Sequence, residues 1–392
     1  MKKTFINKIL GALFLVSSIT SCAPTTQPTS TPTEPSIEPT VEPTVDPTSE
    51  PTVDNNNYRE VTYSNPIIPR DKNGNNMPGA ADPSFVKGDD GYFYIFYTAT
   101  GGGRAIRSKD CVNWELAIGQ VIPRPTWGDG GINNPNVWAP EVVKIKDKWI
   151  FYYSLSGWDN PIGIGYAVSD KISGPYEDKG PLIKGLELKN YNCIDPCIYQ
   201  EDGRIYMAVG SFRGIDLVEL TDDGMALKGG IETQVEEKTL IAGVYGDWNG
   251  GGTEGSYIIK KNDIYYYFGS SGLCCEGSNS TYRVVVGRAK NLKGPYVDDQ
   301  NRMMANFNGH GKVICWAKPT NTDIAGPGHN SIFQDDAGDY WMVYHCYMKD
   351  DNYSTRHLMI DKILWDEKGW PYIENTTPSY HEEKVGPRFI EE

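Results

Sequence analysis

The sequence is short of positive charge and of histidine, and both shortages limit what the protein can bind. It has 37 Lys and Arg against 51 Asp and Glu, giving a formal net charge of −14. That balance argues against a nucleic-acid backbone or an anionic membrane surface as the main partner. Only five residues are His, and neither Cys193 with Cys197 nor Cys274 with Cys275 has a His at the spacing of a zinc site.

Two local motifs lack a residue that their usual function requires. Residues 71–75 read Asp-Lys-Asn-Gly-Asn, like the start of a calcium loop, but the sixth position is Asn76 rather than Gly. The glycine-rich run 249–255 is not followed by the Gly-Lys-Ser/Thr that holds a phosphate. We expect its glycines instead to let the backbone pass close to a ligand at Glu254.

Aromatic residues and glycine, in contrast, are abundant. The chain has 25 Tyr, 10 Trp and 42 Gly. Tyr and Trp favour strands and provide flat stacking surfaces, and frequent glycine favours turns. This composition excludes a helix bundle.

The first 21 residues have the features of an export signal. Lysines at positions 2, 3 and 8 precede the apolar run Ile9–Val16, which is too short to span a bilayer permanently. The following Ile-Thr-Ser-Cys at 19–22 is similar to a bacterial lipobox, so we expect Cys22 to be the lipidated first residue of an envelope-anchored, surface-exposed protein. Loss of the three lysines makes the mature formal charge −17. The alternative is ordinary cleavage nearby, with Cys22 unmodified.

Residues 22–57 form a linker and residues 58–392 the folded domain in our interpretation. The linker is rich in Pro, Thr and acids, with a proline at about every fourth position, so it cannot form a helix or a core. It should act as an extended spacer, although a binding function encoded in the repeat is a less favoured alternative. Seven Cys remain besides Cys22, an odd number that leaves at least one thiol unpaired. We expect small buried apolar groups or an occasional disulfide.

From residue 58 onward the chain repeats one strand pair five times. Each copy has a polar residue, a short apolar strand, an Asp/Lys/Gly turn and an aromatic-rich strand, with the alternation typical of hairpins. The copies begin 55 to 75 residues apart. Hairpins that recur at such intervals are the signature of propeller blades, so the sequence predicts an all-β, five-bladed β-propeller. A pair of β-sandwiches is the alternative, but it would not explain the matching hairpins. The copies begin at Ala81, Ala139, Ile194, Thr253 and Gly328.

Equivalent positions on the innermost strands of a propeller converge on its axis. We assign these positions to four acids and one histidine: Asp82, Glu141, Asp195, Glu254 and His329. Any one acid could cap a turn, but clustered carboxylates raise each other's pKa at a cost in stability, which favours a function. Three such acids suit glycoside hydrolysis, where one carboxylate activates water and one carboxylic acid protonates the leaving oxygen.

Sugar rings also need flat surfaces on which their C–H faces can stack. Trp138, beside the second repeat, is the first candidate, although each tryptophan taken alone is more often part of a core. The other candidates are Trp127, Trp158 and Trp248.

Four motifs in order resemble glycoside hydrolase family 43, a family of five-bladed propellers. They are Asp82-Pro83, Ile194-Asp195-Pro196, Thr253-Glu254-Gly255 and the run 326–331, Gly-Pro-Gly-His-Asn-Ser. Further segments look most like the endo-α-1,5-L-arabinanase branch: Trp138-Ala-Pro-Glu141, Cys274-Cys275 with Ser280-Thr-Tyr282, Val286-Gly-Arg288, and the run from Arg356 to Trp365 before Gly369-Trp370-Pro371. The resemblance covers roughly residues 62–375.

The resemblance implies an inverting mechanism in which Asp82 is the general base, Glu254 the general acid and Asp195 the residue that tunes and orients Glu254. It also implies that His329 helps to hold a hydrated cation, commonly calcium. We expect Trp138, Glu141, Ser280 and Arg356 to contact the substrate. Arabinanases often have His directly before the first Asp, where this chain has Ala81.

Three functions are therefore considered. The first is a monomeric, surface-tethered endo-arabinanase acting on plant cell-wall arabinan. The second is an exo-acting α-L-arabinofuranosidase or β-xylosidase of the same family, acting on arabinan or an arabinoxylan-type polysaccharide. The third is a non-catalytic glycan-binding propeller, which the presence of all three acids disfavours.

Overall fold

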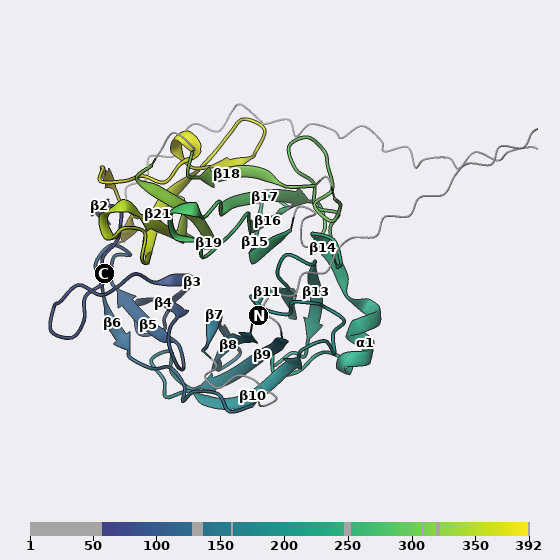
Figure 1. Cartoon of the computed structure of the whole chain (residues 1–392). Coiled ribbons are helices and arrows are strands. Elements are labelled where there is room, and N and C mark those ends of the chain that lie inside the picture. The colour runs from purple at the N-terminus through teal and green to yellow at the C-terminus, as the bar shows by residue number, and fades with distance from the viewer. Residues whose placement is uncertain are drawn as a thin grey trace, which may run out of the picture. The chain divides into compact units, whose positions relative to one another are not determined.

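The computed structural model describes residues 57–127, 136–157, 160–246, 252–307, 309–318 and 322–390. The predicted signal peptide, Cys22 and residues 23–56 of the predicted linker lie outside these ranges. Within them, five four-stranded antiparallel sheets surround one axis (Figure 1). This arrangement confirms the predicted five-bladed β-propeller.

Each blade is built from four strands that are consecutive in sequence, and the first strand of each blade lies nearest the axis (Figure 1). Blade 1 contains β3 (Ala81–Lys87), β4 (Phe93–Thr98), β5 (Arg104–Ser108) and β6 (Trp114–Ile118). Blade 2 contains β7 (Trp138–Ile145), β8 (Lys148–Gly157), β9 (Asn160–Ser169) and β10 (Glu177–Lys184). Blade 3 contains β11 (Cys197–Glu201), β12 (Arg204–Val209), β13 (Ile215–Leu220) and β14 (Thr239–Ala242). Blade 4 contains β15 (Thr253–Lys261), β16 (Ile264–Ser271), β17 (Arg283–Ala289) and β18 (Lys312–Trp316). Blade 5 contains β19 (Ile324–Gln334), β20 (Tyr340–Met348), β21 (Arg356–Trp365) and β22 (Pro371–Tyr372).

The two ends of the domain pair with each other in short antiparallel ladders. Strand β1 (Tyr58–Arg59) pairs with β24 (Phe389–Ile390), and β2 (Thr62–Ser64) pairs with β23 (Glu383–Val385). Both ladders therefore join the start of the domain to its end.

Helical structure is sparse. Within the described ranges the one α-helix is α1 (Gly230–Glu237), between β13 and β14, which the sequence did not predict. Three short 3₁₀ turns complete the secondary structure: η1 (Gly277–Asn279), η2 (Lys349–Asp351) and η3 (Glu374–Thr376). Among the residues that the structure describes, no helix has the length and apolar character needed to cross a membrane.

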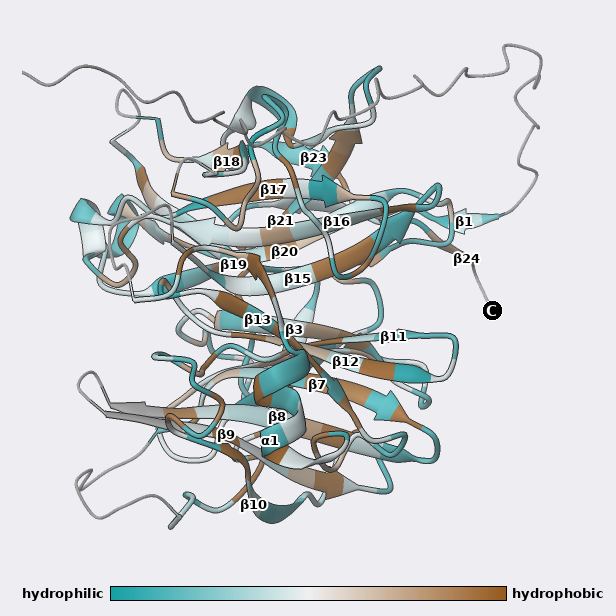
Figure 2. Cartoon of the chain, turned by 90° about the vertical axis from the view of Figure 1, so that its right-hand side faces the viewer, coloured by the Kyte–Doolittle hydropathy of each residue, from teal (hydrophilic) through white to brown (hydrophobic). Residues whose placement is uncertain are grey.

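The apolar core lies between neighbouring blades. Five clusters of buried side chains each combine residues from two adjacent sheets, and together they close the ring. Between blades 1 and 2, for example, the fully buried Phe96 and Phe151 have ring centroids 5.9 Å apart. Figure 2 shows brown, apolar stretches along the strands and teal, hydrophilic turns between them. The aromatic-rich second strand of each repeat thus packs the blades together and fixes the inner strands around the axis.

Candidate active site

The inner strands share an unusual backbone conformation where they begin. One residue in each of four blades has a φ in the left-handed region, and in blade 4 the same conformation falls on Gly255 (φ 58°). The pairing of the inner strand with the second strand also shifts register here in blades 1, 2, 4 and 5, as at a β-bulge. Bulges re-aim side chains, and strained non-glycine residues gather at functional sites. The four residues are Asp82 (φ 54°), Ala139 (φ 33°), Asp195 (φ 58°) and His329 (φ 51°).

This geometry corrects the assignment of Glu141. The residue of blade 2 that corresponds to Asp82 is Ala139, because each has the left-handed φ and each precedes a proline. Glu141 corresponds instead to Ser84, two residues further along the inner strand. The sequence comparison matched acid to acid and so displaced this repeat by two positions. The prediction of four acids and one histidine in register was therefore wrong. Asp82, Asp195 and His329 share the position, Ala139 and Gly255 occupy it in blades 2 and 4, and Glu254 precedes it by one residue.

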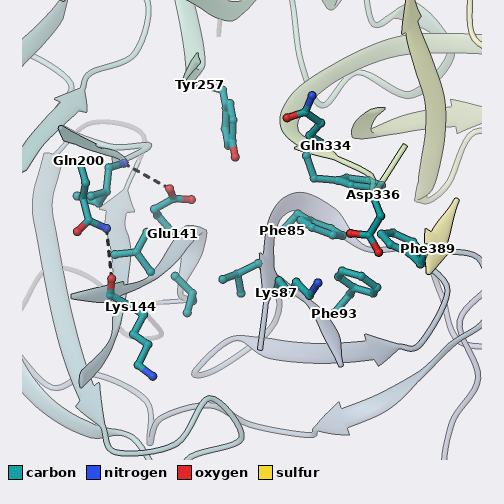
Figure 3. Close-up of a pocket in the computed structure, with 15 residues that line it drawn as sticks. Phe85, Lys87, Phe93, Glu141, Lys144, Gln200, Tyr257, Gln334, Asp336 and Phe389 are labelled. Carbon is teal, nitrogen blue, oxygen red and sulfur yellow. Dashed lines mark hydrogen bonds between the residues drawn. The ribbon is translucent and has the colours of Figure 1, made fainter. Parts of the chain in front are cut away.

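Glu141 lies in a separate environment along the axis. Its Oε2 accepts a hydrogen bond from Ser84 Oγ (2.9 Å), and its Oε1 accepts one from the Ile198 backbone N–H (3.4 Å). It lines a cavity of about 380 Å³ together with residues such as Phe85 and Tyr257 (Figure 3). Burial raises the pKa of Glu141 to about 7, although both hydrogen bonds oppose this shift. None of Asp82, Asp195 and Glu254 is among the residues that line this cavity.

Four residues at the start of the inner strands are held by the preceding blade in the same way. In each case the backbone N–H donates a hydrogen bond to a side chain on the second strand of that blade. The acceptors are His345 Nδ1 for Asp82 (3.1 Å), Thr98 Oγ1 for Ala139 (2.7 Å), Ser154 Oγ for Asp195 (2.8 Å) and Ser270 Oγ for His329 (2.8 Å). The bulged inner strands are therefore fixed by polar contacts between blades as well as by apolar packing.

Asp82 is a buried carboxylate with a cationic partner. Its Oδ1 lies 2.8 Å from Arg356 Nη1, and its Oδ2 accepts a hydrogen bond from Thr98 Oγ1 (2.6 Å). Burial by itself would raise the pKa of Asp82, but the Arg356 guanidinium and the Thr98 hydroxyl outweigh it and hold the pKa well below its usual range. Asp82 is therefore ionised at neutral pH and can accept a proton.

Asp195 and Glu254 have the opposite tendency. Burial, followed by the negative charges of Glu254 and Asp82, raises the pKa of Asp195 well above its usual range. Burial also raises the pKa of Glu254, and the charge of Asp82 adds to this effect. The pair therefore retains a proton to a higher pH than exposed carboxyls would.

Two hydroxyl groups limit the shift at Glu254. Ser211 Oγ donates a hydrogen bond to Glu254 Oε2 (2.6 Å), and Tyr282 OH donates one to Oε1 (2.8 Å). Both bonds stabilise the ionised carboxylate and lower its pKa, against the effect of burial. Asp195 Oδ2 accepts a bond from the Gly255 backbone N–H (3.1 Å), which connects it to the residue after Glu254.

Two histidines complete the site. His329 Nδ1 lies 3.5 Å from Asp82 Oδ1 and 4.0 Å from Asp195 Oδ2. His345 Nδ1 accepts the Asp82 backbone N–H, so a neutral His345 carries its proton on Nε2. Burial lowers the pKa of both rings, which are therefore neutral near pH 7.

The residues around His329 do not provide a direct calcium site. Calcium prefers six to eight oxygen ligands, whereas the described residues contain no cluster of three or more His, Cys, Asp or Glu that could hold a metal ion. Both amide atoms of the buried Asn330 lack a hydrogen-bond partner among the described residues, but its side chain would add only one neutral oxygen ligand. The hydrated calcium ion stays a prediction.

The other predicted substrate contacts have varied surroundings. Arg356 pairs with Asp82, whereas Ser280 Oγ accepts the Glu276 backbone N–H (2.9 Å) and so holds its own loop. Trp138 is partly exposed at the start of β7, and Trp127 donates a hydrogen bond to Tyr153 OH (2.7 Å). Trp158 and Trp248 lie outside the described residues. The substrate contacts of these residues remain predictions.

Four residues of the site were not assigned from the sequence: Thr98, Ser211, Tyr282 and His345. Three of them lie in or directly after the second strand of a blade, where the repeat shows only an aromatic-rich run. Tyr282 belongs to the Ser-Thr-Tyr motif that had been noted, but nothing in the sequence connects its hydroxyl to Glu254. All seven described cysteines are unpaired thiols, so the described part of the chain has none of the disulfides considered.

Comparison with known proteins gives consistent results. The family model described as "Glycosyl hydrolases family 43" matches residues 63–371. An extracellular exo-α-(1→5)-L-arabinofuranosidase of Cellvibrio japonicus is 35% identical over 312 residues, 75% of this chain and 86% of that protein. An extracellular endo-α-(1→5)-L-arabinanase of Bacillus subtilis is 30% identical over 298 residues, 74% of this chain and 86% of that protein. The solved structure of a Cellvibrio cellulosa α-L-arabinanase with arabinohexaose has a TM-score of 0.66 and 32% identity, covering 76% of this chain and 96% of that chain.

Proposed function

The chain belongs to glycosyl hydrolase family 43 and is a glycosidase, and we propose that it hydrolyses α-1,5-linked L-arabinan of plant cell walls within the polymer. The observation that carries this proposal is the contrast among the three buried carboxyls. Asp82 is held ionised by Arg356, whereas Asp195 and Glu254 are pushed toward protonation. Carboxyls whose pKa values are driven apart are what acid–base hydrolysis of a glycosidic bond requires.

In the proposed mechanism, Asp82 removes a proton from a water molecule as that water attacks the anomeric carbon. Glu254 donates its proton to the glycosidic oxygen as the bond from the anomeric carbon to that oxygen breaks. The water oxygen thus ends on the new reducing end, on the face opposite the departed sugar, and the configuration is inverted. Asp195 accepts the N–H of Gly255, the residue after Glu254, and in this mechanism orients the acid.

Exo action is a second candidate, favoured by the 35% identity to the Cellvibrio japonicus exo-arabinofuranosidase. Digestion of linear arabinan separates the two modes. Endo cleavage yields a ladder of oligosaccharides and a rapid fall in viscosity, whereas exo cleavage yields one short product and little early change in viscosity. If arabinan is left intact, the substrate proposal is wrong. If Asp82→Asn and Glu254→Gln proteins are both fully active, the site assignment is wrong.

We also propose that the enzyme is exported and held at the cell envelope, as a monomer, through a lipid on Cys22. The two curated relatives named above are both called extracellular, which supports export. The sequence similar to a lipobox at 19–22 supports the anchor. Replacement of Cys22 by Ser should move the protein from the membrane fraction to the soluble fraction, and unchanged fractionation would contradict the anchor.

A further inference from the structure

Two exposed tyrosines lie in the loops that lead to Asp195 and Glu254. Tyr191 is in the loop between β10 and β11, four residues before Asp195, and is 51% exposed. Tyr245 is in the loop between β14 and β15, nine residues before Glu254, and is 41% exposed. Both loops precede inner strands, so both lie at the end of the propeller where the three carboxyls are found.

Both loops are fastened to one buried carboxylate, Asp216. Asp216 Oδ2 accepts hydrogen bonds from Asn190 Nδ2 (2.9 Å) and Lys238 Nζ (2.8 Å), and its Oδ1 accepts the hydroxyl of Tyr245. Asp216 and Asn190 are completely buried, and the Lys238 side chain is 9% exposed. A buried ion pair contributes little net stability, but it defines one geometry for the groups that it joins. Tyr245 and the residue before Tyr191 are thus both held at fixed positions.

The aromatic ring of Tyr245 is fixed to the turn that also supports Glu254. A Cβ atom added to Gly214 would lie 3.0 Å from Tyr245 Cδ1, so the ring packs directly on the glycine backbone. Gly214 belongs to the turn 210–214 between β12 and β13, and Ser211 in the same turn donates its hydroxyl to Glu254. Lys238 Nζ lies 4.8 Å from the ring centroid. The residue nevertheless stays 41% exposed.

We propose that Tyr245, together with Tyr191 on the loop fastened to the same Asp216, forms a stacking platform for the arabinose units on the leaving-group side of the cleaved bond. This inference rests on the proposed function. The general acid must contact the glycosidic oxygen of the leaving group. The leaving-group part of the arabinan therefore begins at Glu254 and continues over the protein loops next to it. Sugar rings stack on exposed aromatic faces, and a rigid platform binds them at a low cost in entropy.

The test compares Tyr245→Ala, Tyr191→Ala and Tyr245→Phe proteins on linear arabino-oligosaccharides of increasing length. Tyr245→Ala should raise KM roughly tenfold on long chains, leave kcat nearly unchanged, and have little effect on the shortest substrate cleaved. Tyr191→Ala should give a smaller effect of the same kind. Tyr245→Phe keeps the ring and should stay close to the wild-type protein.

Tyr92→Ala is the matched control. This tyrosine also lies under a cation, with Lys109 Nζ 4.0 Å from its ring centroid, but it follows β3 at the opposite end of blade 1 from Asp82. It should not change KM for any chain length. Equal effects of Tyr245→Ala on short and long substrates, or none on either, would overturn the platform. Calorimetry of arabinohexaose with the wild-type protein separates a failure of the platform from a failure of the proposed function. If the wild-type protein neither binds nor cleaves arabinohexaose, the proposed function is refuted as well.

Discussion

Replacement of Arg356 by Met tests how Asp82 is kept ionised. Arg356 Nη1 lies 2.8 Å from Asp82 Oδ1, and the two side chains are only 20% and 10% exposed. Met has a similar length without the charge, so the variant leaves a buried carboxylate unpaired. Loss of one partner from a buried ion pair costs about 3–5 kcal/mol. We therefore expect the free energy of unfolding at pH 7 to fall by about that amount in urea titrations.

Arg107 provides the matched control. Its Nη2 is also 2.8 Å from a carboxylate, that of Glu115, but these side chains are 36% and 54% exposed. Exposed pairs contribute about 0–1 kcal/mol, so Arg107→Met should be nearly silent. Arg356→Lys keeps a positive charge and should be less destabilised than Arg356→Met. It also provides a folded protein if Arg356→Met does not fold.

The same substitution should change the pH dependence of activity. With its pKa held low, the Asp82 carboxylate contributes stability that is present above its unfolded-state pKa and is lost as the pH falls through its folded-state pKa. His329 and His345 are neutral near pH 7, so Arg356 is the main charge that maintains this state. Without Arg356 the effect of burial dominates, the pKa of Asp82 rises, and the acidic limb of kcat/KM moves to higher pH. Equal stability losses for Arg356→Met and Arg107→Met, with an unmoved acidic limb, would refute this reasoning.

Three further predictions concern the other buried carboxyls. Glu254→Gln should lower kcat on arabinan about 10²–10⁴-fold but have little effect on an aryl arabinoside with a good leaving group, and equal losses on both would argue against an acid role. Tyr282→Phe removes a hydrogen bond that lowers the pKa of Glu254, so the alkaline limb of kcat/KM should move to higher pH, whereas a shift to lower pH would contradict this role. Glu141→Gln should reduce the dependence of the free energy of unfolding on pH. The wild-type protein should lose stability as the pH rises from about 4.5, the usual pKa of a Glu, through about 7, the pKa of Glu141 in the folded protein. If the difference in urea midpoint between the wild-type and Glu141→Gln proteins is the same at pH 5 and at pH 8, the pKa of Glu141 is not raised.

The architecture could be predicted from the sequence because the repeat is a local pattern of residue types. Each blade repeats an apolar strand, a polar turn and an aromatic strand, and the aromatic residues, such as Phe96 and Phe151, pack between blades. Asp82 and Asp195 were found because the inner strands place equivalent positions around one axis, and Glu254 because it lies one residue before that position in blade 4. The blades and these acids can be predicted because they depend on the spacing of residues within each repeat.

The residues that were missed depend on contacts between blades. His345 and Thr98 are on second strands, and each holds an inner-strand residue of the next blade, a relation that no local spacing reveals. Glu141 was misplaced because acid was matched to acid, whereas the ladders of blades 1 and 2 resume at Ser84 and Glu141 after the same irregularity. Arg356 was expected to contact substrate, but its partner in the structure is Asp82, 274 positions away in the sequence.

The stereochemistry of the first product tests the central claim most directly. If Asp82 activates water and Glu254 protonates the leaving oxygen, proton NMR during early hydrolysis of a linear arabino-oligosaccharide should show the new reducing end first with inverted anomeric configuration. Mutarotation should then produce the other anomer later. Appearance of the substrate's own configuration first would mean a double displacement through a covalent intermediate, and it would contradict the assignment of Asp82 as the base.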